Sequence, residues 1–124
     1  MALVLVKGVI FQCSHAGQTK LSDGSAKLTV NNSGVITSGM EQGISFGPGP
    51  DNLSPCTNTT TSSPPVLAPC QITAPAGVGV ASKLTVGGVG VLLDSANGLT
   101  TNTQGAPPGT WKIANAGQTL LTAV

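Results

Sequence analysis

Aromatic and charged residues are scarce in this 124-residue chain. It has no tyrosine, and its aromatic residues are Phe11, Phe46 and Trp111, although aromatic side chains normally supply the largest buried areas in a core. Its few charged residues include no arginine. Without a basic cluster or stacking aromatic residues the chain offers no electrostatic surface for nucleic acid, so we expect no nucleic-acid partner.

Residues typical of helices, membrane spans and export signals are scarce as well. The helix-forming residues include a single glutamate and five lysines. No stretch approaches the roughly 20 apolar residues of a membrane-spanning helix. The start of the chain, Met1–Lys7, lacks a basic segment, and its apolar run is too short for a signal peptide. We therefore expect synthesis in the cytoplasm without a signal peptide, with any export by another route.

The residues that are abundant favour strands and turns. Valine, leucine, alanine, isoleucine and threonine pack on pleated sheets, and the 17 glycines permit tight turns. The length suits one domain over 1–124. We predict an all-β fold, with strands near Leu3–Gln12, Ala26–Val30, Val35–Thr37, Ile44–Phe46, Cys70–Thr73, Ser82–Val86, Val89–Leu93, Thr110–Ala114 and Gln118–Ala123.

Turns and two long loops separate the predicted strands. Gly87-Gly88 is typical of a two-residue hairpin turn, and Asn31–Gly34 predicts a slightly longer one. The proline-rich segment Gly47–Pro69 predicts a long, mostly irregular loop, because proline cannot donate to a strand ladder. A disordered linker is the alternative, but Cys56 within the segment and Cys70 at its end favour a tethered loop. A second loop is expected over Thr100–Gly109.

Two short motifs occur twice. Lys27-Leu28-Thr29-Val30 returns as Lys83-Leu84-Thr85-Val86, and Ala16-Gly17-Gln18-Thr19 returns as Ala116-Gly117-Gln118-Thr119. Four-residue matches also arise by chance in a chain rich in threonine and glycine, so internal duplication and coincidence both stay open. No longer period persists, which excludes a solenoid.

The soft metal ligands of the chain are Cys13, His15, Cys56 and Cys70. Four is the number that a tetrahedral zinc site needs, and three cysteines with one histidine form an ordinary structural set. Residues 13 and 15 of one strand would point to the same face, and the proline-rich loop would deliver the other two. The sequence therefore predicts a metal site, with zinc as the expected ion and iron as the alternative.

Three other interpretations compete with the metal site. Cys56 and Cys70 could form a disulfide, or the cysteines could be unlinked buried residues with His15 at the surface. A small hydrolase or thiol enzyme would depend on His15, but the chain has no nucleophile-elbow motif and its acidic residues are scattered. We expect no catalytic activity.

Several blocks resemble the PAAR-like proteins that cap the spikes of contractile injection systems, which include type VI secretion and phage-tail-like particles. The first is a strand that runs into Cys-Ser and a glycine over residues 6–17, followed by the Lys27–Val30 motif. The paired strands after Cys70 and the ending from Trp111 to Gly117-Gln118 are similar to the middle and closing blocks of that family. The Pro-Ala-Ala-Arg signature and the usual set of histidines are absent, so the metal role would pass to the four residues above.

The resemblance implies a small cone of β-hairpins on the blunt end of a trimeric β-helical spike, with hairpins placed in pseudo-threefold fashion. Such a protein would sharpen the spike, help it to puncture a target membrane and retain effector cargo. It would be assembled into an injection particle and delivered to the extracellular space or a target cell. The alternative is a capsid-decoration or fibre protein that forms a homo-oligomer.

Overall fold

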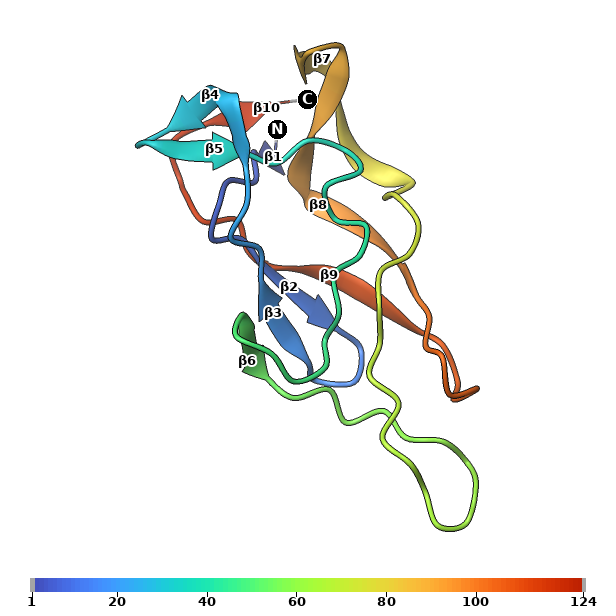
Figure 1. Cartoon of the computed structure of the whole chain (residues 1–124). Helices are drawn as coiled ribbons and strands as arrows, with labels where there is room; N and C mark the ends of the chain where they lie inside the picture. Colours follow the sequence, from blue (N-terminus) through green and yellow to red (C-terminus); the bar gives the residue numbers. More distant parts are fainter. Residues whose placement is uncertain (1, 124) are drawn as a thin grey trace.

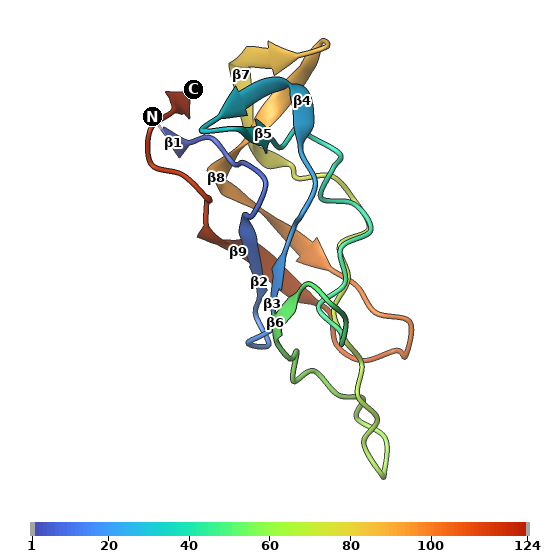
Figure 2. The ribbon, with the colours of Figure 1, turned by 60° about the vertical axis from the view of Figure 1, so that its left-hand side comes forward.

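A computed structural model of the chain describes residues 2–123. The molecule is elongated, with a broad end that carries both chain termini and a narrow end formed by one loop (Figures 1 and 2). No helix occurs among the described residues, which confirms the all-β prediction. In particular, residues 2–123 contain no helix that is long and apolar enough to cross a membrane.

Three antiparallel sheets make up the fold. Six strands form the largest sheet in the order β6-β3-β2-β9-β8-β7, and two small sheets pair β1 with β10 and β4 with β5. The strands are β1 (Ala2–Leu3), β2 (Ile10–Cys13), β3 (Gln18–Lys20), β4 (Ser25–Val30), β5 (Ser33–Val35), β6 (Asn52–Ser54), β7 (Val78–Val86), β8 (Val89–Thr100), β9 (Gly109–Asn115) and β10 (Thr122–Ala123).

Three strand pairs meet at the broad end: β4–β5, β7–β8 and the pair that β10 makes with β1 (Figure 1). Their inner segments are joined by backbone hydrogen bonds that run in a circle. Leu5 N donates to Leu92 O at 3.0 Å, Leu92 N donates to Ile36 O at 2.8 Å, and Ile36 N donates to Leu5 O at 2.9 Å. Each pair thus contacts the other two in the same way, which gives this end an approximate threefold symmetry.

The three pairs also share a pattern of side chains. In the outer strands, an exposed residue is followed by a half-buried leucine, an exposed threonine and a small apolar residue: Lys27–Val30, Lys83–Val86 and Leu120–Ala123. In the inner strands, the matching valines Val4, Val35 and Val91 are fully buried. The valines and the small apolar residues, together with the three leucines packed against them, belong to one hydrophobic cluster. The Lys-Leu-Thr-Val repeat therefore marks structurally equivalent positions.

The β4–β5 hairpin and the β7–β8 hairpin close with the same type of two-residue turn. Asn31 and Asn32 have φ of 51° and 66°, and Gly87 and Gly88 have φ of 60° and 83°. Positive φ at both central residues is the geometry of a type I′ turn, which matches the twist of the flanking strands. The prediction for Gly87-Gly88 is confirmed, whereas the first turn is shorter than predicted because asparagine also tolerates positive φ.

Several predicted strands differ from those of the structure. The first predicted strand, Leu3–Gln12, is broken between β1 and β2 by a turn at Gly8, where φ is 96°. The predicted strands near Ile44–Phe46 and Cys70–Thr73 reduce to isolated bridges, in which Gln71 pairs with Ser45 and with Thr101. The segment Gly47–Pro69 is not wholly irregular, since it contains β6.

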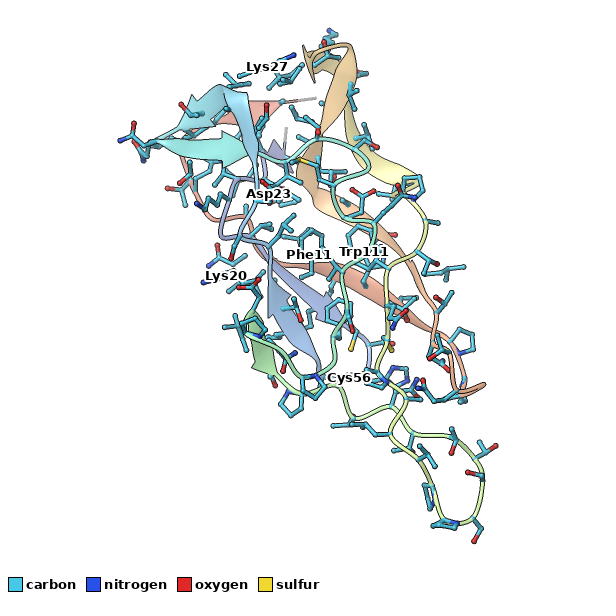
Figure 3. The ribbon with its side chains drawn as sticks, viewed as in Figure 1. Phe11, Lys20, Asp23, Lys27, Cys56 and Trp111 are labelled. Carbon is cyan, nitrogen blue, oxygen red and sulfur yellow. The ribbon has the colours of Figure 1, made fainter. Side chains whose placement is uncertain are left out.

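A second hydrophobic core lies between the large sheet and the segments that lead to the narrow end. Its centre is formed by Phe11 and Trp111, whose ring centroids are 5.5 Å apart at an interplanar angle of 59°. The three cysteines belong to this core. The aromatic residues therefore occupy the middle of the molecule, and the sulfur atoms continue the core toward the narrow end (Figure 3).

Candidate metal centre

The four predicted ligands come from segments that are far apart in the sequence. Cys13 is the last residue of β2, and His15 lies in the turn that follows. Cys56 follows β6, and Cys70 directly follows the segment 57–69, which we call the tip loop. In Figure 3, Cys56 lies where the tip loop leaves the body of the molecule. The predicted ligands thus meet at the base of the narrow end.

The ligand atoms lie within 4.8 Å of one another. Cys13 Sγ is 3.5 Å from Cys56 Sγ, Cys56 Sγ is 3.7 Å from Cys70 Sγ, and His15 Nδ1 is 3.2 Å from Cys70 Sγ. For Zn–S bonds of about 2.3 Å, tetrahedral geometry places neighbouring sulfur atoms roughly 3.8 Å apart. The spacing suits a four-coordinate ion, and the four residues could bind a metal.

The same geometry bears on the competing interpretations. All three cysteines are free and buried, so the structure contains no bond between Cys56 and Cys70. The cysteines are buried core residues, as the second interpretation expects, but their sulfur atoms and the histidine nitrogen also lie close enough together to bind an ion. His15 Nδ1 is directed at Cys70 Sγ, which places the side chain that a catalytic triad would use within the sulfur cluster.

Hydrogen-bond donors surround each sulfur atom. The backbone N–H groups of His15 and Gly17 donate to Cys13, with Gly17 N at 3.2 Å from the sulfur. Cys56 receives the backbone N–H groups of Asn58 and Cys70. N–H···S bonds of this kind stabilise thiolate charge, which is the form of cysteine that binds metals.

Burial and these donors set the pKa values of the thiols. Burial raises the pKa of Cys13 to about 12 and also raises the pKa of Cys70. Burial acts in the same direction on Cys56, but hydrogen bonds from Asn58, Cys70 and Cys13 outweigh it, and the pKa of Cys56 is lowered. In the metal-free protein, Cys56 therefore ionises most readily, and a metal must displace protons from the other two thiols.

Two glycines make room for the cluster. A Cβ atom on Gly17 would lie 2.9 Å from Cys13 Sγ and 3.0 Å from Cys56 Cβ. A Cβ atom on Gly109 would lie 2.8 Å from His15 Cε1 and would also collide with the hydroxyl of Ser14. The sequence predicted the four residues of the cluster but not these glycines, since nothing in the sequence connects Gly109 with His15.

No family model, curated protein or solved structure matches this chain. The structure itself shows an all-β fold and three strand pairs in an approximate threefold arrangement. It also shows a cluster of three cysteines and one histidine that could bind a metal ion.

Proposed function

We propose that this protein is a PAAR-like spike-tip protein of a contractile injection system. In this proposal, the broad end caps a trimeric β-helical spike and the narrow end leads into the target membrane. The role is structural and not catalytic, and the narrow end retains its shape through a metal ion. The protein travels with the injection particle and can retain effector cargo.

The circle of hydrogen bonds through Leu5, Ile36 and Leu92 is the observation that carries this proposal. A single chain with approximate threefold symmetry can present three similar strand pairs to a threefold partner, which resolves the mismatch between one tip and three spike chains. Strand edges and small side chains suit docking on a flat β platform. The three half-buried leucines of the outer strands leave apolar surface at this end that a partner could cover.

The distribution of charge supports the orientation. Residues 52–82 and 95–111, which include the tip loop at the narrow end and the loop over residues 101–108, contain no charged side chain. Moving a charge into hydrocarbon costs several kcal/mol, so an uncharged leading end lowers the barrier to membrane entry. The lysines and acidic residues lie outside these segments.

The donor set supports zinc as the metal. Three thiolates and one imidazole form an ordinary structural zinc set, whose bound ion supplies folding free energy to a segment with little core of its own. Iron is the alternative, because thiolates also bind iron. Elemental analysis of protein purified without added metal distinguishes the two, and less than a tenth of an equivalent of either would contradict the metal centre.

A binding experiment tests the spike-tip role. Co-purification with a trimeric β-helical spike protein is expected to give one copy of this chain per trimer by native mass spectrometry. Leu120→Asp, at a residue 69% exposed on the broad end, should weaken the complex at least tenfold. The matched control is Leu99→Asp, at a residue 73% exposed near the end of β8, which should leave binding unchanged.

Two results would contradict this role. One is failure of the wild-type protein to bind any trimeric spike protein encoded beside it. The other is a stable homotrimer of the isolated chain, which would favour the capsid-decoration or fibre protein instead.

A further inference from the structure

Two buried polar side chains lie against the sulfur of Cys70. Thr100, the last residue of β8, is fully buried, and Asn58 of the tip loop is 5% exposed. Polar groups are costly to bury unless they are hydrogen-bonded, so the partners of these two side chains explain their position. Both side chains direct donors toward Cys70 Sγ.

The hydroxyl of Thr100 has a fixed direction. Thr100 Oγ1 accepts a hydrogen bond from Gly109 N at 3.0 Å, and hydrogen bonding by this side chain acts to lower the pKa of the Cys70 thiol against the larger, opposite effect of burial. A hydroxyl has a single proton to donate. Because the Gly109 contact uses Oγ1 as an acceptor, the proton is available to the sulfur of Cys70.

The amide of Asn58 divides its two protons in a similar way. Asn58 Nδ2 donates to Pro107 O at 3.1 Å and lies 3.8 Å from Cys70 Sγ. The first contact fastens the tip loop to the loop over residues 101–108, and the second directs the same amide toward the sulfur. Asn58 thereby connects the tip loop and the loop over residues 101–108 to Cys70.

This arrangement distinguishes Cys70 from the other cysteines. Cys13 and Cys56 receive N–H donors from the backbone, which do not depend on a polar side chain at the donor positions. The sulfur of Cys70 instead has two side chains as hydrogen-bonding partners, Asn58 and Thr100, so a substitution of either residue can remove a partner. Three thiolates with one divalent ion and a neutral imidazole carry a net negative charge, so donors to the sulfur atoms are needed in a buried site.

We infer that Thr100 and Asn58 are positioning residues of the metal centre, which orient the Cys70 thiolate, stabilise its charge and fix both loops to the bound ion. This inference rests on the metal centre of the proposed function. Removal of such outer-shell partners typically weakens metal binding 10–100-fold.

The test is titration of the full chain with Co²⁺, followed by absorption of the thiolate-to-cobalt charge-transfer bands. Thr100→Val, which retains the shape and loses the hydroxyl, is expected to weaken cobalt binding about 10–100-fold and to shift the bands. Thr100→Ser should restore both properties. Asn58→Ser should weaken binding in the same direction.

Thr101→Val is the matched control, because the exposed hydroxyl of Thr101 bonds to Thr73 at 3.3 Å, away from the sulfur atoms. Its affinity and bands should equal those of the wild type. If wild-type protein binds no cobalt, the metal centre and this inference both fail. If wild-type protein binds but Thr100→Val and Asn58→Ser leave affinity and bands unchanged, the inference alone fails. If Thr100→Val does not fold, the cobalt affinity and the charge-transfer bands of Asn58→Ser test the inference instead.

Discussion

At the scale of single residues, space around the sulfur atoms is as important as the ligands themselves. Gly17 follows His15 by two positions and donates its backbone N–H to Cys13 Sγ. The close approach of Gly17 to Cys13 and Cys56 leaves no room for a methyl group. The turn after β2 must therefore carry glycine at this position if the two cysteines are to stay together.

Gly17→Ala should consequently destabilise the metal-loaded protein by about 1–3 kcal/mol, the usual cost of overpacking a core. It should also weaken metal binding, because the methyl group pushes Cys13 Sγ away from Cys56. Gly77→Ala is the control, since its Cβ would have no atom within 4 Å and its φ is not positive. Denaturant unfolding and chelator competition measure both effects, and equal values for the two variants would contradict the role of Gly17.

The cluster of Cys13, His15, Cys56 and Cys70 was predictable because the chain contains so few candidate metal ligands. With three cysteines and one histidine, the set follows from composition once a tetrahedral site is assumed. Thr100 and Asn58 were not predictable, because they are two among many threonines and asparagines and their contacts are set by the long-range fold. The distance between Thr100 and Cys70 along the chain carries no signal that connects them.

At the scale of elements, the repeated strand pairs were only partly visible in the sequence. The two copies of Lys-Leu-Thr-Val have the same local structure because each precedes a two-residue turn. The third copy, Leu120–Ala123, keeps only Leu-Thr of the motif, and its partner strand is at the other end of the chain. The other repeated motif, Ala-Gly-Gln-Thr, does not mark structurally equivalent positions, since Gln18 begins β3 while Gln118 lies outside any strand.

The threefold pattern predicts that equivalent leucines contribute equally to stability. Leu28, Leu84 and Leu121 are each half-buried against the same cluster. Each Leu→Ala variant should cost about 1–2 kcal/mol, below the 2–5 kcal/mol of a fully buried position. Leu99→Ala, at an exposed site of β8, should cost much less. Denaturant unfolding measures the four values, and a spread among the first three that is wider than this range would argue against equivalence.

At the scale of the whole molecule, the two ends are held by different forces. The broad end has its own apolar cluster and the circle of backbone hydrogen bonds. The tip loop has little apolar core, and its residues Val66 and Leu67 are about half exposed. The base of the tip loop is held by the sulfur cluster and by backbone bonds such as Thr57 N to His15 O at 2.9 Å. A bound ion would join four chain segments at this point.

Removal of the metal should therefore loosen one end before the other. With a strong chelator, amide hydrogen exchange should accelerate at Thr57 and at Phe46, whose N–H donates to Cys70 O at 2.9 Å. Exchange at Leu5, Ile36 and Leu92 should change little, because their circle of bonds is independent of the ligands. The unfolding midpoint should fall by roughly 10 °C as the binding free energy is lost.

A metal-free variant separates these effects from those of the chelator. Cys70→Ser removes one ligand with a small change in volume, and it should show the same fast exchange at Thr57 whether or not chelator is present. Uniform acceleration at both ends would mean that the molecule unfolds as one unit and that the metal stabilises the broad end as much as the narrow one. Unchanged exchange at Thr57 in both experiments would mean that backbone and core contacts are enough to hold the narrow end, and the ion would have no structural role there.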